Sequence, residues 1–470
     1  MLKTTELQSV FIDTNMNRIF KYIFVFILCS VVSLGAYAQD AVPTLSDEQK
    51  KHLAKEMYEE GVDEKGEPVV DVKETIFHHL GDGYGWEVPF MHIYRIPLPV
   101  IVKAEDGKWF CFSSSKLTEV VVTEVIDKDG KTKAYETLVP VIHNVEKDGK
   151  TYSFVIAHAS NHKNKVVQVF PLSQQDQAAV EAHLAQAGEA GEHDVIIDGY
   201  VNIAGQYYRE YRPLDISITK NVLALFIASV IVTALVMILV RFYRRKGLYA
   251  PRKGMGFFEM LINFVYEGVI VSNLGKKADK FAPYLLTAFF FILIMNLLGL
   301  IVIFPGGANL TGNIAITLVL AIITFIITNV MGTKHYWKEI FWPDVPLLLK
   351  FPLPIMQIIE VFGIFTKPAA LCIRLFANMM GGHMIVITLT LLIFIFAAFG
   401  AAATGAATVV SLLFSIFMLV LDVLVSFIQA YVFTLLSAIF ISLGQESHEE
   451  HEEKHEQQSE NAEETQIQKA

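Results

Sequence analysis

Arg374 has the most unusual setting of any charged residue in this 470-residue sequence, because it lies inside a long apolar stretch. Apolar residues flank it on both sides, and a further apolar run extends from Met384 to Phe399. A guanidinium near the middle of a bilayer costs about 2.5 to 3.5 kcal/mol on insertion scales. It stays protonated, so it can attract or repel ions but cannot relay a proton. We therefore expect Arg374 to act as a fixed positive charge beside a cation path.

Three other polar residues share one side of the predicted helix with Arg374. Glu360 and Lys367 precede it at seven-residue spacing, and Asn378 follows four residues after it. These spacings place the side chains on one narrow stripe. Such a stripe faces protein or water rather than lipid. The alternative is that Arg374 forms a structural ion pair with another membrane residue.

A second polar stripe lies in the last apolar stretch of the chain. Asp422, Ser426 and Gln429 occupy positions i, i+4 and i+7 of an otherwise apolar helix. The carboxyl group of Asp422 could neutralise Arg374 or Lys367. It could instead take up and release protons, which is the usual role of ionisable residues in membrane pathways.

His383 is the natural partner of Asp422 in a proton relay, because an imidazole also titrates near neutral pH. Nine residues separate His383 from Arg374, which places them on different sides of a straight helix unless Gly381-Gly382 bends it. Ions that pass His383 and Asp422 would then not share a face with the blocking arginine.

The segment KPAALCIRLFANM, from Lys367 to Met379, resembles the signature of subunit a of F-type ATP synthases. This resemblance implies that Arg374 faces a rotating ring of c subunits, each of which carries an ion-binding carboxylate. Asn378, Gln429 and Glu360 match the family pattern, and Glu360 would line the cytoplasmic side of the path.

One pair departs from the pattern of many bacterial members. They carry a glutamate at the position of His383 and a histidine at the position of Asp422, so the base and the acid are exchanged here. This arrangement is like that of mitochondrial members. The resemblance therefore implies that the chemistry of the pair is kept while its positions are swapped.

The resemblance implies a non-catalytic stator subunit that provides two offset half-channels for protons. Its expected partners are the c ring, subunit b, the remaining ATP synthase subunits and the lipid bilayer, with no nucleic acid, metal or cofactor. The complete phosphate-loop pattern Gly-x4-Gly-Lys-Ser/Thr is absent from the sequence. The sequence does not decide between proton and sodium transport, or between ATP synthesis and hydrolysis. The stoichiometry of the ring is equally open.

Two other classes of function could place charged residues in a membrane. A secondary transporter for a small solute would also carry midplane charges, but it predicts internal repeats, and we find no convincing repeat. A structural membrane anchor would leave the set of Arg374, His383 and Asp422 unexplained.

The composition, with 53% apolar residues, indicates an integral membrane protein with one sizeable soluble portion. We predict an α-helical membrane protein with about five spans plus an interfacial helix, and an N-terminal soluble β-rich α+β domain. The last two spans are long enough to require steep tilt, with bends at Pro368 and Gly381-Gly382. The predicted spans are 222–240, 283–304, 313–331, 353–399 and 409–443, with the interfacial helix at 256–274.

Four domains follow from these patterns. Residues 1–38 resemble a signal peptide, with Met1 or Met16 as the start and cleavage before Gln39. An uncleaved first transmembrane helix is the alternative. Residues 39–213 form an exported domain, residues 214–444 the membrane domain, and residues 445–470 an acidic disordered tail.

The basic cluster that follows the first span sets the predicted orientation. Arg241, Arg244, Arg245 and Lys246 come directly after the apolar run. The positive-inside rule puts such a cluster in the cytoplasm. We therefore expect a multi-pass protein of a bacterial inner membrane, with a periplasmic N-terminal domain and a cytoplasmic C-terminal tail.

Local signals predict the elements of the exported domain. Asp-Gly dipeptides at 106–107, 129–130 and 148–149 favour tight hairpin turns. One helix is expected over 45–60 with Ser46 as its N-cap, and another from Ser173 and Asp176 to Gly188. A final strand is expected over 195–204. Histidines at 78, 79, 158 and 162 lack a compact metal-ligand spacing, so no metal site is assigned there. The role of this domain is not decided by its sequence.

Overall fold

A computed structural model describes residues 44–59, 81–88, 91–126, 132–158, 160–190, 196–247, 254–301, 309–341, 355–397 and 401–445. The predicted signal peptide, the Asp129-Gly130 turn, His78 and His79 lie outside these residues. Residues 44–59 and 82–220 form one compact unit, and residues from Asn221 to Gln445 form a second. Each unit is described by itself below.

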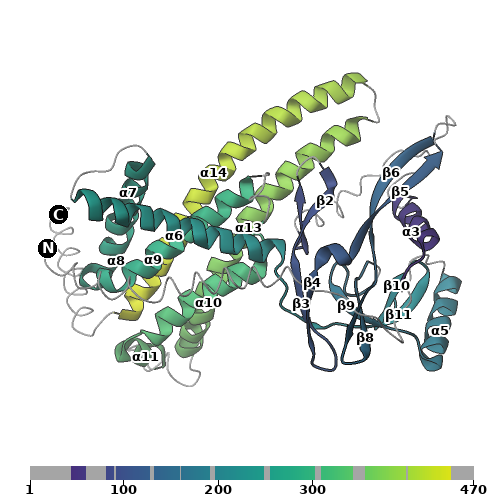
Figure 1. Ribbon diagram of the computed structural model, residues 1–470. Coiled ribbons are helices and arrows are strands. Elements are labelled where there is room, and N and C mark those ends of the chain that lie inside the picture. The colour runs from purple at the N-terminus through teal and green to yellow at the C-terminus, as the bar shows by residue number, and fades with distance from the viewer. Residues whose placement is uncertain are drawn as a thin grey trace, which may run out of the picture. The chain divides into compact units, whose positions relative to one another are not determined.

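The first unit is rich in antiparallel strands, as the sequence predicts (Figure 1). A five-stranded sheet has the order β10-β11-β9-β8-β7, and a three-stranded sheet has the order β12-β3-β4, while β1-β2 and β5-β6 form separate pairs. The strands are β1 (Gly85–Val88), β2 (Met91–Pro97), β3 (Pro99–Lys103), β4 (Trp109–Ser113), β5 (Thr118–Ile126), β6 (Thr132–Pro140), β7 (His143–Lys147), β8 (Lys150–Ile156), β9 (Val166–Phe170), β10 (Tyr200–Ile203), β11 (Gln206–Tyr211) and β12 (Leu214–Asp215).

The five-stranded sheet is buried on both faces. Strand β8 shows this directly, because Phe154 belongs to one apolar cluster and its neighbour Val155 to another, both without solvent exposure. Successive side chains of a strand point to opposite faces, so each cluster covers one face. Phe110 and Phe112 of β4 contact Phe154 with ring centroids 5.3 and 5.5 Å apart. The β12-β3-β4 sheet therefore packs on one side of the larger sheet.

Both predicted helices of this unit are present, as α3 (Asp47–Glu59) and α5 (Gln174–Ala190). Each begins with a reciprocal capping box, in which side chain and backbone of two residues bond to each other. The Gln49 N–H donates to Ser46 Oγ at 3.2 Å, and the Ser46 N–H donates to Gln49 Oε1 at 2.9 Å. Ser173 and Asp176 form the same pair of contacts at α5, with distances of 3.1 and 3.2 Å.

The end of this unit differs from the prediction. The expected strand over 195–204 is shorter, because β10 covers only Tyr200–Ile203, and the strands β11 and β12 follow it. Leu214 and Asp215 pair with Lys103 and Val102 of β3. The folded unit therefore extends to Lys220, beyond the predicted boundary at residue 213.

His143 predicts a dependence of this unit's stability on pH. Burial and the charge of Lys116 lower the pKa of His143 to about 4, and its ring packs edge-on to Phe112 at 5.0 Å. Unfolded histidine binds a proton near pH 6.5, so the unfolded state holds more protons between pH 6.5 and 4. Stability is therefore lost as the pH falls through this window, by about 1 kcal/mol after a discount for partial exposure. Hydrogen exchange of β7 and β8 amides in the full chain measures this, and His143→Phe should remove the loss.

The second unit is helical, and its long apolar helices confirm the predicted membrane class. Among the residues that the structure describes, four helical stretches are long and apolar enough to cross a membrane, and the shorter apolar α10 completes the predicted set of about five. The elements are α6 (Lys220–Lys246), α7 (Gly254–Val265), a π-helical segment (Tyr266–Val271), α8 (Ser272–Leu274), a 3-10 turn (Gly275–Lys277), α9 (Ala278–Leu300), α10 (Ile314–Val330), α11 (Lys334–Phe341), α13 (Ile355–Ala397) and α14 (Ala401–Gln445).

Helices α7 and α9 fold back on each other. Gly275 turns the chain between them with φ of +51°, a backbone conformation that glycine adopts easily. Phe258 of α7 and Phe290 of α9 then lie with ring centroids 4.5 Å apart. The helical segment predicted over 256–274 is thus present and begins two residues earlier, at Gly254. Its place at the membrane interface stays a prediction. The next span begins at Ala278, with Pro283 inside it.

Helices α13 and α14 run side by side as a long hairpin (Figure 1). They contain 43 and 45 residues, so each is about 65 Å long, about twice the thickness of the hydrocarbon core. Neither can stand upright in a bilayer, as the sequence predicts. Helix α13 continues without interruption through Pro368 and Gly381-Gly382. Gln445 is the last residue of α14, and the rest of the predicted tail lies outside the described residues.

Candidate functional site

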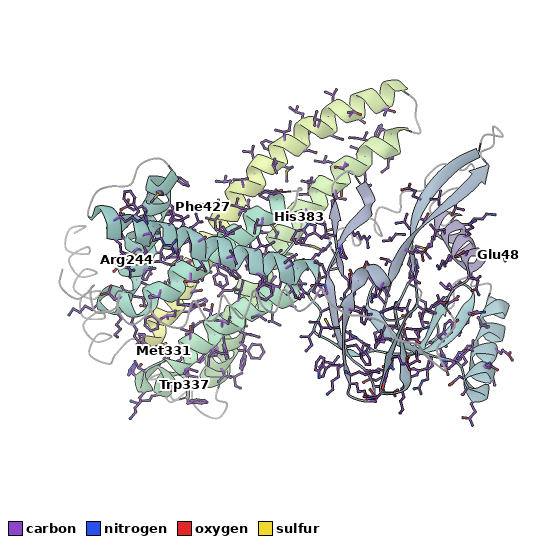
Figure 2. All side chains as sticks on the ribbon, viewed as in Figure 1. Glu48, Arg244, Met331, Trp337, His383 and Phe427 are labelled. Carbon is purple, nitrogen blue, oxygen red and sulfur yellow. The ribbon has the colours of Figure 1, made fainter. Side chains whose placement is uncertain are left out.

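The second polar stripe and Asn378 of the first line a small pocket between α9, α13 and α14. It has room for about one water molecule, with a volume of about 10 Å³. His383 lies on its α13 wall (Figure 2) and Asp422 on its α14 wall. The residues that line it are Asn296, Leu300, Leu375, Asn378, Met379, Gly382, His383, Asp422, Val425, Ser426 and Gln429. Five of the seven residues that the sequence singled out therefore line the pocket, while Arg374 and Glu360 do not.

Gly382 makes room for the carboxylate of Asp422. A Cβ atom at position 382 would lie 2.7 Å from Asp422 Oδ1 and 3.1 Å from its Cγ. Real Cβ atoms do not approach so closely, so any larger residue would force the carboxylate to move. The sequence identified the Gly381-Gly382 pair only as a bend. A glycine that makes room for an acidic side chain from another helix leaves no recognisable pattern in a single sequence.

One ring nitrogen of His383 has no hydrogen-bond partner among the described residues. Its Nε2 atom is buried, and no residue of the described part of the chain bonds to it. A buried polar atom without a partner costs about 1 to 3 kcal/mol, so such atoms usually bind water or a partner. His383 therefore contributes an unsatisfied ring nitrogen to the residues that line the pocket.

Asn378 and Gln429 join α13 to α14 by a side-chain hydrogen bond. Asn378 Nδ2 donates to Gln429 Oε1 at 2.7 Å. Gln429 is 4% exposed, whereas Asn378 is exposed on the surface of the helix pair. The pair therefore connects the pocket to the outside of α13 and fixes the rotation of the two helices.

Ser426 is placed in the pocket but bonds to the backbone. Its hydroxyl donates to the carbonyl oxygen of Asp422 at 2.7 Å, one turn earlier in α14. This is the common internal bond of serine in apolar helices. The hydroxyl therefore does not reach the carboxylate of Asp422 directly, which makes its expected part in a proton path the weakest of the set.

Asn296 of α9 is a further candidate residue at the pocket. It is 2% exposed, lines the pocket, and accepts a hydrogen bond from Thr311 Oγ1 at 2.7 Å. Thr311 is fully buried and was not identified from the sequence. A polar residue in an apolar helix was the available signal for Asn296.

Arg374 lies outside this pocket, and its side chain is exposed on α13. Among the described residues it forms no hydrogen bond and no ion pair, with Asp422 or with any other acid. Its neighbour Ile373 is 60% exposed on the same surface. The alternative prediction, an ion pair between Arg374 and Asp422, is therefore not observed among the described residues.

A second pocket lies on the other side of Arg374 along α13. It has a volume of about 20 Å³ and is lined by Thr324, Phe325, Thr328, Asn329, Tyr336, Ile364, Lys367, Pro368, Leu371 and Phe440. The Lys367 ammonium lies 5.6 Å from the ring centroid of Phe440. Burial and the negative charge of Glu360 raise the pKa of Tyr336, one of the residues that line this pocket. Leu371 and Leu375 belong to different pockets and bracket Arg374.

Comparison with known proteins identifies the family of the membrane part. The family model described as ATP synthase A chain matches residues 222–442. A separate model, described as a domain of unknown function, matches residues 75–170 of the N-terminal unit.

Several curated relatives carry the name ATP synthase subunit a. The protein of Pelodictyon phaeoclathratiforme is 35% identical over 342 residues, which cover 69% of this chain and 96% of the relative. The protein of Anaeromyxobacter dehalogenans is 37% identical over 58% of this chain and 78% of its own length.

The relative from Chlorobaculum tepidum, named ATP synthase subunit a 2, is 41% identical over 236 residues. This match covers 50% of the present chain and 65% of the relative. The agreement therefore extends beyond the arginine motif to the entire membrane unit. The chain belongs to the ATP synthase A chain family.

Proposed function

We propose that this chain is the ion-conducting stator subunit of a rotary F-type ATP synthase, and that the two pockets belong to two separate half-channels. One observation carries the proposal. Arg374 is exposed, has no partner among the described residues, and lies on α13 between the pocket of His383 and Asp422 and the pocket of Lys367. A fixed charge in that position separates two polar paths without closing either.

Protons enter through the pocket of His383 and Asp422. A water molecule fits this pocket and would bond to the buried Nε2 of His383. Asp422, packed against Gly382, is the carboxyl group of the relay. Asn378 and Gln429 then lead from the pocket to the exposed surface of α13. The order of the steps is from outside, past His383 and Asp422, to that surface.

A ring of c subunits receives the proton at the exposed surface of α13. Each ring subunit carries a carboxylate, which crosses lipid cheaply only when it is protonated. The deprotonated carboxylate pairs with Arg374, which offsets the cost of exposing either charge to lipid. Rotation in one direction follows, because the next carboxylate must be neutralised before it can leave.

Protons leave toward the cytoplasm through the second pocket. The charge of Glu360 acts on Tyr336, which lines that pocket, and Asn329 and Thr328 add polar groups to its wall. The Lys367 ammonium contributes a positive charge there. Water passing these groups connects Glu360 to the solvent on the side of the basic residues that end α6.

The chain performs no ATP chemistry itself and couples ring rotation to catalysis in other subunits. Its partners are the c ring, the subunit b stator and the remaining subunits, and the translocated ion is the proton. The N-terminal unit faces the periplasm, since the basic residues from Arg241 to Lys246 follow the first span. A secondary transporter is not favoured, because relatives aligned over the membrane unit are named ATP synthase subunit a.

Asp422→Asn tests the relay. Asparagine keeps the size of the side chain but cannot exchange protons, so we expect passive proton conduction by the membrane sector to fall by about tenfold or more. ATP-driven acidification of inverted vesicles should fall in parallel. Both are measured with a pH-sensitive dye in vesicles that hold equal amounts of assembled complex.

Asp279→Asn is the matched control, because Asp279 is an exposed acid of α9 that only accepts a hydrogen bond from Tyr266 at 2.8 Å. It should conduct at the normal rate. Normal conduction by Asp422→Asn would remove the acid from the path and leave the proposed relay without its carboxyl group.

A further inference from the structure

The β12-β3-β4 sheet has one buried face and one exposed face. Val100, Val102, Phe110 and Phe112 fill the buried face and are at most 5% exposed. Pairing register places Leu214, Lys103 and Trp109 in one row of the opposite face. The next row contains Ile216, Ile101 and Cys111, because the Ile216 N–H donates to the Ile101 carbonyl at 2.9 Å. We call these six residues the outer face.

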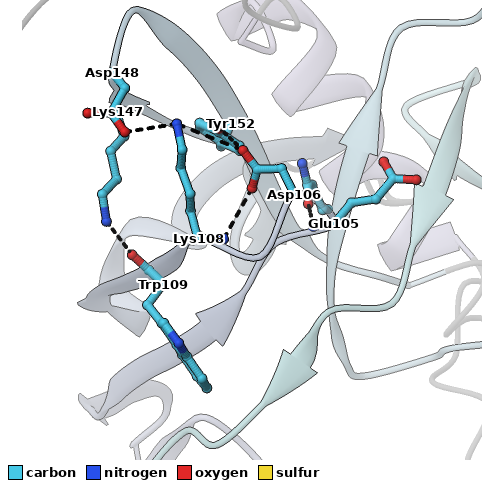
Figure 3. Close-up of polar contacts among 8 residues, drawn as sticks. Glu105, Asp106, Lys108, Trp109, Lys147, Asp148 and Tyr152 are labelled. Carbon is cyan, nitrogen blue, oxygen red and sulfur yellow. Dashed lines mark hydrogen bonds and ion pairs between the residues drawn. The ribbon is translucent and has the colours of Figure 1, made fainter.

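The outer face is largely apolar although it faces outward. Leu214, Ile216 and Trp109 are 59%, 57% and 43% exposed. Figure 3 shows the indole of Trp109 pointing away from the polar cluster of Asp106, Lys108 and Tyr152. Contiguous exposed apolar side chains of this kind usually mark a protein or membrane contact. The outer face is therefore expected to be covered.

Side-chain hydrogen bonds fix the chain segment that carries Leu214 and Ile216. Between them, Asp215 accepts hydrogen bonds from the Tyr84 hydroxyl and from the Ser217 N–H, the latter at 2.9 Å. Ser217 Oγ in turn accepts from the Ile101 N–H at 2.9 Å. Because successive side chains of a strand alternate, Leu214 and Ile216 lie on the side of the strand opposite to Asp215 and its hydrogen bonds. The exposure of Leu214 and Ile216 therefore results from their positions in an ordered sheet.

Chain connectivity places the outer face close to the membrane surface at which α6 begins. Ile216 precedes Asn221 by five residues, and the candidate span Lys220–Arg245 has a mean hydropathy of 3.0. Five extended residues reach at most about 18 Å. A 26-residue helix is about 39 Å long, which exceeds the hydrocarbon core by about 9 Å. The first turns of α6 therefore lie in the headgroup region, within reach of the outer face.

The side chains of the outer face suit the headgroup region. Tryptophan is enriched there because its ring is apolar while its N–H can bond to polar groups. The Lys103 ammonium lies 6.0 Å from the Trp109 ring centroid, at the end of an apolar stem. Such a side chain places its charge at phosphates while the stem stays in apolar surroundings. Leu214 and Ile216 supply the purely apolar part.

We propose that the outer face lies on the lipid bilayer, with Trp109, Leu214 and Ile216 in the interfacial region and Lys103 directed at lipid phosphates. The N-terminal unit is then held at the membrane by this face as well as by α6. The proposal concerns the lipid contact alone and does not depend on ion conduction or on the side of the membrane that the unit occupies.

A spin label on Cys111 tests the proposal in the full chain. Cys111 is an exposed thiol in the second row of the outer face, whereas Cys372 is buried. The labelled chain is reconstituted into vesicles of phosphatidylethanolamine and phosphatidylglycerol. Collision of the label with oxygen, which concentrates in lipid, is compared with collision with a water-soluble nickel chelate. Cys111→Ser measures background labelling, and Cys111→Ser with Ala182→Cys places the label on the exposed side of α5.

We expect the Cys111 label to collide more with oxygen and less with the nickel chelate than the label at position 182. The difference between the two labels should become smaller when the protein is held in detergent micelles instead of vesicles. Free access of the chelate to Cys111 would mean that the outer face is open to water, and the proposal would be wrong. Protection from both reagents would show a protein partner or a second copy instead, which also overturns it. Equal collision rates of the two labels with each reagent would also overturn the proposal.

Discussion

Replacement of Arg374 by alanine should abolish ATP-driven proton pumping while the complex still assembles. The side chain is exposed and bonds to no described residue, so its loss should leave the packing of α13 and α14 unchanged. The ring carboxylate would lose the one fixed charge that stabilises its deprotonated form. Protons could then pass between the two half-channels without turning the ring.

Pumping is measured in inverted membrane vesicles, with the amount of assembled complex determined on the same membranes. Ile373→Ala is the matched control, because Ile373 is exposed beside Arg374 and contributes no charge. It should pump at a rate close to normal. Normal coupled pumping by Arg374→Ala would mean that the arginine is dispensable, and the stator mechanism proposed here would have to be withdrawn.

Gly382→Ala should slow proton conduction, whereas Gly381→Ala should not. The added methyl group at 382 would lie 2.7 Å from Asp422 Oδ1, while a Cβ at 381 meets no atom within 4 Å. Alanine favours helix at both positions, so the helical propensity changes equally. Only at 382 must the carboxylate move. Overpacking of about 1.4 kcal/mol corresponds to about a tenfold loss of conduction.

This pair of variants separates a role of the pocket from a role of helix flexibility. If the two glycines served only as a bend, both alanine variants would impair conduction to a similar degree. Passive proton uptake by vesicles with the catalytic sector removed measures the path itself. Equal rates for Gly382→Ala and the unaltered chain would show that the carboxylate of Asp422 can occupy another position and still function.

The membrane character and the motif around Arg374 are properties of the sequence alone. Runs of apolar residues longer than a bilayer is thick predict spans whatever the tertiary contacts, because lipid offers the backbone no hydrogen bonds. The N-caps at Ser46 and Ser173 and the turn at Asp148-Gly149 were also predicted, since each depends on residues at most three positions apart. Local chemistry determines these features.

Features that join distant residues needed the tertiary structure. The fold-back of α7 on α9, the pairing of β12 with β3, and the contact of Asp422 with Gly382 connect positions that lie between 32 and 113 residues apart in the chain. A single sequence does not say which helix faces which, because apolar helices have no strongly preferred neighbour. The sequence therefore determined which residues could carry a proton, and only the packing of α9, α13 and α14 decided that His383 and Asp422 share a pocket from which Arg374 is excluded.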